Sequence, residues 1–268
     1  MTQPQQTAPP IPLFAHDVDL TVLVTCYNER EFILDTLHEL TSALAEWGGS
    51  HEVIIVDDCS PDGSGEMLEQ HLRDNPMPQV RLVRNAANKG LSKNFIDGAF
   101  LGRGKYYRLC CGDNAESREA LVHIYRQIGK ADLIIPYQVQ DEVRGKLWHR
   151  RIISRLFTAL VNLLTDNDIR YYNSLPVFLR EHVIRFPPQS YGFGFQADIV
   201  TRILEEDVTY LQTRHLGPRD LKGKDSTALS MRNLLSVMHT FVEISIRRLR
   251  RTIYGKGMPR AREIRIEP

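Results

Sequence analysis

Short apolar runs alternate with amphipathic stretches along the first half of the chain. The runs LTVLVT at residues 20–25 and VIIV at residues 53–56 predict buried strands. Between them, apolar residues recur at helical spacing, at Ile33, Leu37, Leu40 and Leu44. The same alternation predicts strands at 80–83, 106–111 and 133–135, and helices at 65–72, 91–101 and 118–128. This βαβ spacing indicates an α/β fold, a mostly parallel sheet with helices on both faces, over about the first 135 residues.

Longer amphipathic stretches follow beyond residue 140. Residues 148–164 begin with basic side chains and carry one apolar stripe, and a long helix is predicted at residues 228–253. The second of these helices contains the basic run RRLRR at residues 247–251. Shorter elements are expected at 177–179 and 195–204, with a strand at 208–211. Helices of this kind either pack on a core or lie in a membrane interface, and the sequence leaves both interpretations open.

These patterns divide the chain into three parts. Residues 1–18 begin with a segment rich in Gln and Pro and predict a disordered tail without the features of a signal peptide. Residues 19–225 form the predicted α/β domain, and residues 226–268 form a C-terminal amphipathic and basic helix with its tail. No stretch reaches the ~18 apolar residues of a spanning helix, so the chain is not expected to cross a bilayer by itself.

Charge and cysteine content narrow the class of protein. The net charge of +1 gives no global attraction to nucleic acid, so no nucleic-acid partner is expected. The four cysteines include no CxxC pair, which argues against a disulfide framework or a zinc site and favours a reducing, cytoplasmic environment. The glycine patterns of P-loop and dinucleotide-binding proteins are missing as well, which disfavours a kinase or a dehydrogenase.

Three polar clusters follow three of the predicted strands. They are TCYNE at 25–29, DDCSPDGS at 57–64 and GDN at 112–114. Each by itself also fits a turn or a cap. In a parallel sheet the carboxyl ends of the strands form the crevice that binds ligands. We therefore expect the three clusters to lie together in one binding site.

The segments TVLVTCYNE, VIIVDDCSPDGS, ANKGLSKNFIDGAF and YYRLCCGDN resemble the inverting family-2 glycosyltransferases, which have the GT-A fold. The resemblance covers about residues 20–220, and residues 149–180 resemble its dolichyl-phosphate mannose synthase-like branch. It implies that residues 19–225 are a GT-A domain that uses a nucleotide-diphosphate sugar. The nucleotide-binding residues that it implies are Thr25, Tyr27, Asn28, Glu29, Asp57, Asp58, Asn88, Lys89 and Asn94.

The third cluster is similar to the family's DxD metal motif but departs from it. The chain has Cys111-Gly112-Asp113, so only the second acid is present. Mg²⁺ or Mn²⁺ bound to a diphosphate needs only one or two protein carboxylates, and Asp113 with Asn114 is the expected metal site. A thiol at position 111 is a poor ligand for Mg²⁺.

The resemblance implies transfer of a hexose, with inversion, from a GDP- or UDP-sugar to a polyprenyl phosphate. Such an acceptor, with a second pKa of about 6, needs cations and no general base; Arg151 and Arg180 are candidates. An alternative is a hydroxyl acceptor, for which Asp198 is the candidate base. A second alternative is a non-catalytic nucleotide-sugar-binding or scaffold protein. The chain is expected to be peripheral on the cytoplasmic face of a membrane, against lipid or a membrane-protein partner.

Overall fold

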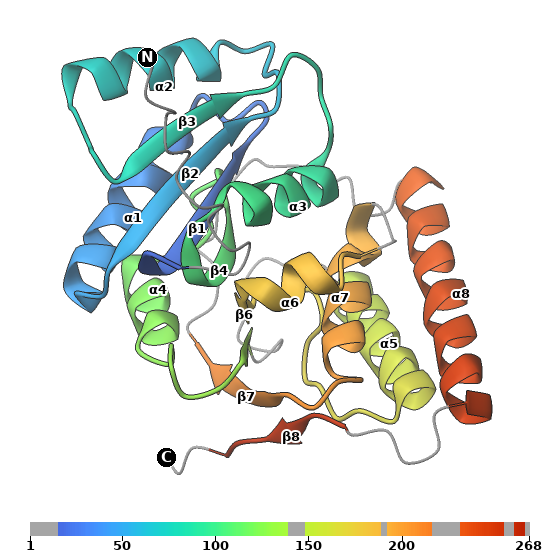
Figure 1. Cartoon of the computed structure of the whole chain (residues 1–268). Coiled ribbons are helices and arrows are strands. Elements are labelled where there is room, and N and C mark those ends of the chain that lie inside the picture. The colour runs from blue at the N-terminus through green and yellow to red at the C-terminus, as the bar shows by residue number, and fades with distance from the viewer. Residues whose placement is uncertain (1–15, 139–147, 189–191, 216–230, 255–259, 266–268) are drawn as a thin grey trace, which may run out of the picture.

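The computed structural model of the chain describes residues 16–138, 148–188, 192–215, 231–254 and 260–265 (Figure 1). The described strands are β1 Val18–Cys26, β2 His51–Asp57, β3 Val80–Arg84, β4 Gly104–Cys111, β5 Leu133–Tyr137, β6 Val177–Leu179, β7 Thr209–Arg214 and β8 Arg262–Glu263. The described helices are α1 Ile33–Trp47, α2 Ser64–Asp74, α3 Leu91–Leu101, α4 Arg118–Tyr125, α5 Trp148–Thr165, α6 Arg180–Arg185, the 3-10 turn η1 Gly192–Gly194, α7 Phe195–Ile203 and α8 Met231–Tyr254.

The strands form one sheet in the order β3-β2-β1-β4-β6-β5-β7-β8. Most neighbours are parallel, and β6 is antiparallel to both β4 and β5. The sequence therefore predicted the α/β class and the mostly parallel sheet correctly. It did not predict β8, which pairs with β7 and so brings the C-terminal segment onto the edge of the sheet.

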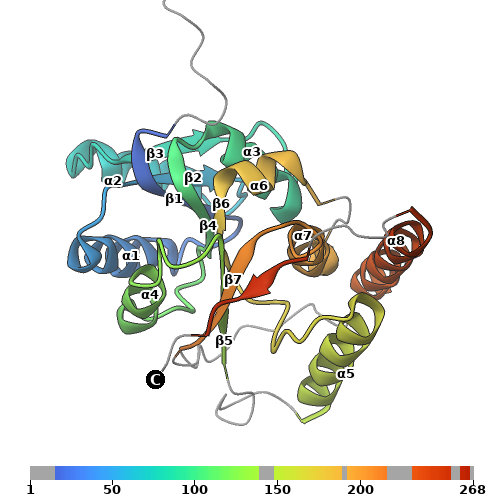
Figure 2. The same cartoon turned by 60° about the horizontal axis from the view of Figure 1, so that its bottom comes forward.

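Two apolar cores lie on the two faces of the sheet, and Figure 2 shows the helices that cover these faces. One core is formed with α1, α2 and α4, and the other with α3, α6 and α7. The strands between them are apolar on both faces, as a sheet covered on both sides requires. In β1, for example, Val22 and Val24 belong to the first core and Leu23 to the second.

The helices α5 and α8 lie side by side at the outer side of the second core, to which they contribute the buried Val161 and Ile244 (Figures 1 and 2). Phe157 of α5 packs on Phe241 of α8 with ring centroids 5.4 Å apart. Each helix keeps an apolar stripe exposed; the stripes are Ile152, Leu156, Leu160 and Leu163 on α5, and Leu235, Met238, Val242, Ile246, Leu249 and Ile253 on α8. No helix among the described residues has the length and apolarity to span a membrane.

Most element boundaries agree with the sequence prediction, and α3 begins and ends where it was predicted. The tail was predicted to reach residue 18, but β1 already begins at Val18; residues 1–15 lie outside the described residues. The C-terminal helix was predicted to start at residue 228; residues 228–230 lie outside the described residues, and the described helix runs from Met231. α4 ends at Tyr125, before the predicted 128, where the chain turns toward β5.

Candidate active site

Three loops follow the adjacent parallel strands β2, β1 and β4 at one edge of the sheet. The backbone joins them directly, because Asp58 N–H donates to Cys26 O at 2.8 Å and Gly112 N–H donates to Thr25 O at 2.9 Å. Asn28 N–H also donates to the Ser60 hydroxyl at 3.2 Å. The structure thus brings together the three polar clusters that the sequence placed at strand ends.

One non-glycine residue in each loop has a left-handed backbone. These residues are Asn28, Cys59 and Asn114, with φ of 58°, 61° and 53°. Asparagine tolerates this conformation, whereas cysteine incurs a steric cost in it, and the Cys59 thiol donates only a long hydrogen bond to Ala86 O at 3.8 Å. Strained backbone of this kind is concentrated at functional sites, which makes this edge the candidate active site.

Asp58 organises the neighbouring loop at the start of α3. Its Oδ1 accepts hydrogen bonds from Lys89 N–H and the Asn85 side chain, both at 2.8 Å, and its Oδ2 accepts from Gly90 N–H at 2.8 Å. Burial by itself raises the pKa of Asp58, but these donors outweigh it and hold the pKa below its ordinary value. Asp58 is therefore an ionised carboxylate that fixes the loop carrying Lys89. Its contact with a nucleoside stays a prediction.

The other predicted nucleotide-side residues lie around this loop. Asn94 is buried and accepts from Asn85 at 2.8 Å, while Asn88 is exposed. The Lys89 ammonium is exposed and pairs with Asp97 at 2.7 Å. An exposed pair of this kind is weak, so an incoming diphosphate can compete for Lys89.

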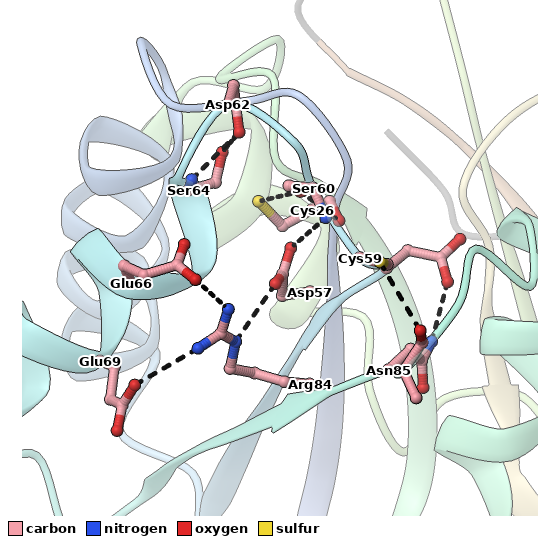
Figure 3. A network of polar contacts seen from close by, with 12 residues as sticks. Cys26, Asp57, Cys59, Ser60, Asp62, Ser64, Glu66, Glu69, Arg84 and Asn85 are labelled. Carbon is pink, nitrogen blue, oxygen red and sulfur yellow. Dashed lines mark hydrogen bonds and ion pairs between the residues drawn. The ribbon is translucent and has the colours of Figure 1, made fainter.

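Asp57 supports the second loop from below (Figure 3). It is almost fully buried; its Oδ1 accepts from Ser60 N–H at 3.1 Å, and its Oδ2 faces Arg84 Nε at 3.5 Å. Arg84 also contacts Glu66 and Glu69 of α2. A side chain at Gly65 would meet Asp57 at 2.2 Å, so glycine is required for α2 to approach this carboxylate. Asp57 thus holds the loop that Asp58 begins.

The first loop presents its polar side chains beside the third. Tyr27 is exposed, while Thr25 and Glu29 are partly buried. A Cβ at Gly112 would lie 2.8 Å from Thr25 O and 3.4 Å from Glu29 Cγ. Glycine at position 112 therefore lets the loop that carries Asp113 approach the first loop.

The third loop is anchored to a buried charge that sequence reasoning missed. Arg108 of β4 is fully buried, and its Nη2 contacts Glu116 Oε1 at 2.5 Å. Burial by itself lowers the pKa of Arg108, and the Glu116 carboxylate more than offsets this, so its pKa lies above the ordinary value. The signal in the sequence was an arginine inside the otherwise apolar run YYRLCC. Arg108 fixes Glu116, three residues beyond Asp113.

The donor groups in this loop fit a metal that is also held by a diphosphate. Within the described parts of the chain, no three His, Cys, Asp or Glu side chains gather to hold a metal ion by themselves. Burial, with Asp113 and Glu116 nearby, raises the pKa of Cys111, so its thiol is neutral and not a ligand for Mg²⁺. One oxygen of the Asp113 carboxylate accepts a hydrogen bond from Ala115 N–H at 3.3 Å, and Asn114 is the next residue in the chain.

A second carboxylate, that of Glu116, lies in the same loop, and its Oε2 is buried without a hydrogen-bond partner among the described residues. One carboxylate and a diphosphate suffice for such a metal.

Two predicted catalytic residues lie elsewhere. Arg180 is buried at the opposite edge of the sheet, where it donates to Gly104 O, at the start of β4, at 2.8 Å. Asp198 is fully buried in α7 and pairs with Arg202 and Arg247. The prediction that Arg180 contacts the acceptor and the alternative that Asp198 is an accessible base do not fit these positions, because the core encloses both side chains. Arg151 lies on α5, and its side chain is outside the described part of the structure.

Comparison with known proteins agrees with this arrangement. The family model "Glycosyl transferase family 2" matches residues 21–187. The chain is 27% identical over 220 residues to an undecaprenyl-phosphate mannosyltransferase of Micrococcus luteus, covering 76% of this chain and 87% of the relative. It is 26% identical to a dolichol-phosphate mannosyltransferase of Pyrococcus furiosus, covering 76% of this chain and 60% of that relative.

A solved structure shares the fold. The glucosyl-3-phosphoglycerate synthase of Mycobacterium tuberculosis, in complex with Mn²⁺, UDP and phosphoglyceric acid, superposes with a TM-score of 0.62 at 13% identity, over 95% of this chain and 86% of that one. The fold is therefore GT-A-like. Since the family model covers more than half of the chain, the chain belongs to glycosyl transferase family 2 and is a glycosyltransferase.

Proposed function

We propose that the chain transfers a hexose from a GDP- or UDP-sugar to a polyprenyl phosphate, with inversion, at a membrane surface. The observation that carries the proposal is the pair of exposed apolar stripes on α5 and α8, attached to a family-2 glycosyltransferase site. Exposed apolar patches of this kind mark protein or membrane contacts. The relatives named as undecaprenyl- and dolichol-phosphate mannosyltransferases support the choice of acceptor.

The donor is bound by the strand-end loops. Asn28, Glu29 and Asp58 contact the nucleoside, with Thr25, Tyr27, Asp57, Asn88 and Asn94 around it, and Lys89 offsets diphosphate charge after leaving Asp97. Asp113 and Asn114 hold Mg²⁺ or Mn²⁺. When bound, the metal neutralises charge that develops on the leaving diphosphate. The Arg108–Glu116 pair keeps the loop that carries Asp113 in place.

The acceptor supplies its own nucleophile. A phosphate monoester, with a second pKa of about 6, is largely ionised at neutral pH and needs no base. This fits the position of Asp198, which is fully buried and paired with two arginines. Arg151, on the same helix as the exposed stripe of α5, is the proposed cationic contact for the phosphate.

The exposed stripes support the proposed attachment of the enzyme to the cytoplasmic face of a membrane. Leu156 and Leu163 of α5 and Leu249 of α8 are each at least 60% exposed. Arg250 is exposed beside Leu249. Apolar side chains that enter the interface, together with roughly 1 kcal/mol from each basic residue near anionic lipid, suffice for reversible attachment.

A transfer assay tests the proposal. Purified protein is incubated with UDP- or GDP-sugars, Mn²⁺ or Mg²⁺, and either polyprenyl phosphate or the matching polyprenol. Transfer is expected only to the phosphate. Asp113→Asn should lower transfer by about 10²–10³-fold, as loss of one transition-state contact does.

Asp207→Asn is the matched control, since Asp207 is an exposed aspartate whose ion pair with Arg262 is long, at 3.6 Å. It should retain activity within about twofold, since surface changes of this kind are nearly neutral. Transfer to polyprenol but not to the phosphate would overturn the proposed acceptor. Full activity of Asp113→Asn would overturn the role of the third loop.

A further inference from the structure

The helix α8 has two faces with different surroundings. One face carries the exposed stripe that includes Leu235, Met238 and Val242. On the other face, Thr240 and Ile244 are fully buried. Since α8 packs on η1, α7 and α5, it joins the exposed surface to the interior of the domain (Figure 1).

The turn η1 lies directly on the buried face of α8. A Cβ built on Gly194 would fall 1.8 Å from Thr240 Oγ1, and one on Gly192 would fall 2.8 Å from Ser236 Oγ. Gly192 also has a φ of +77°, which favours glycine. Backbone and helix thus touch without a side chain between them, so a shift of α8 must displace the turn.

A buried ion-pair network fastens the same helix to α7. The Asp198 carboxylate is fully buried and lies 2.8 Å from Arg247 Nη1 of α8. Arg247 also donates to the Thr201 hydroxyl at 2.5 Å and to Glu205 Oε1 at 3.1 Å. Removing one partner of a buried pair leaves an uncompensated charge. Arg247 therefore holds α8 and α7 in one fixed arrangement.

The turn connects this arrangement to the candidate active site. Directly after η1, Phe195 packs on Phe95 of α3 with ring centroids 5.5 Å apart. The helix α3 begins at Leu91, next to Gly90, whose N–H donates to Asp58. A continuous set of contacts thus runs from the exposed stripe, through Arg247 and η1, to the loop that Asp58 holds.

We propose that Arg247 is a positioning residue that couples α8 to η1 and α7, so that contact of α8 with an anionic lipid surface fixes the turn and, through Phe195 and Phe95, the loop that Asp58 holds. The inference rests on the proposed attachment to a membrane. It gives Asp198 a role as the buried partner of Arg247 in place of the catalytic role that the sequence suggested.

Hydrogen exchange of the whole protein tests the coupling without using transfer activity. Amide exchange of residues 192–203 is measured with and without vesicles of phosphatidylcholine and phosphatidylglycerol, and binding is measured by flotation. In the wild type, vesicles should slow exchange of this segment about tenfold. In Arg247→Met the protein should still float with vesicles, but the slowing should fall below about twofold.

Further variants separate coupling from general damage. Arg73→Met removes an exposed arginine of α2, which is not part of the proposed membrane contact, and should keep the tenfold effect. Arg247→Lys should restore part of it. If Arg247→Met does not fold, Glu205→Gln, which removes one partner of Arg247 and leaves the Asp198 pair, should weaken the effect.

Three outcomes overturn the proposal: wild-type protein that does not bind the vesicles, binding without a change in residues 192–203, or equal protection in wild type and the Arg247 or Glu205 variant. Transfer to polyprenyl phosphate in detergent tests the proposed function separately. A failure of coupling is therefore distinguishable from a failure of the function.

Discussion

The side chains of Leu37 and Leu40 in α1 are at most 1% exposed, whereas those of Leu156 and Leu163 in α5 are 64% and 79% exposed. Both helices carry apolar residues at the same three- and four-residue spacing. The difference lies in what covers them. α1 packs against the sheet and α4, while α5 buries one face, with Val161, against the second core and α8 and leaves the other face exposed.

The two halves of the molecule differ in the same way. In the first half, apolar side chains of helices close one continuous core, and the strand-end loops above it hold their polar groups in mutual hydrogen bonds. In the second half, α5 and α8 close part of a core and leave their other faces exposed. An identical periodicity thus supports folding in one region and supplies a contact surface in the other.

The largest expected difference is in the free energy of unfolding when a leucine of α1 and a leucine of α5 are each truncated to alanine. Leu40→Ala should lower the free energy of unfolding by about 2–5 kcal/mol, because it opens a cavity in a packed core. Leu156→Ala should change it by no more than about 0.5 kcal/mol, because the side chain is already in water. Urea unfolding of both variants measures this. A loss above about 2 kcal/mol in Leu156→Ala would mean that α5 is covered within the chain.

Attachment to lipid is the next largest effect. Leu163→Ser should weaken binding to anionic vesicles by about tenfold, since full burial of a leucine contributes roughly 1.5–3 kcal/mol and immersion in the interface is partial. Phe100→Ser on α3 is the control, because Phe100 is 52% exposed and α3 packs mainly on α6, β1 and β2, away from α5 and α8. Equal losses in the two variants, measured by flotation, would remove α5 from the contact surface.

Lowering the pH should destabilise the first half of the molecule through protonation of Asp58. Its pKa is lowered in the folded state, so its stabilising contribution is present above the unfolded pKa of about 3.9 and is lost as pH falls through the folded value. Asp58→Asn should therefore lower the free energy of unfolding by about 1 kcal/mol near pH 6, and the difference from wild type should shrink below pH ~4. Denaturant unfolding across this range checks it; a constant difference would contradict the charged hydrogen bonds.

The smallest effect concerns backbone strain at Cys59. Its φ of 61° costs about 1–2 kcal/mol in a non-glycine residue, while glycine loses about 0.5–1 kcal/mol more conformational freedom on folding. Cys59→Gly should therefore stabilise the protein by about 0.5 kcal/mol. Gly48→Ala is the opposite control, because Gly48 also has a positive φ, and it should destabilise by about 1 kcal/mol. Thermal unfolding compares the two, and a destabilised Cys59→Gly would show that the thiol itself contributes.

Local patterns accounted for most of the fold. The spacing that predicted α3 at 91–101 and the strands around it reflects burial on both faces of the sheet. β8 was missed because two residues give no periodicity, and they become a strand only by pairing with β7. Arg108 was missed because a buried charge is stable only with its partner, and Glu116 reaches it through the fold.

The sequence by itself determined the α/β class, the family resemblance and the placing of three polar clusters at strand ends, because these depend on local periodicity and short motifs. The tertiary structure decided which apolar stripes are covered and which polar side chains face the site. It enclosed Asp198 with Arg247 and Arg180 with the start of β4, since partners far apart in the chain meet only after packing. Burial and ion pairing are properties of these long-range contacts, and no local pattern encodes them.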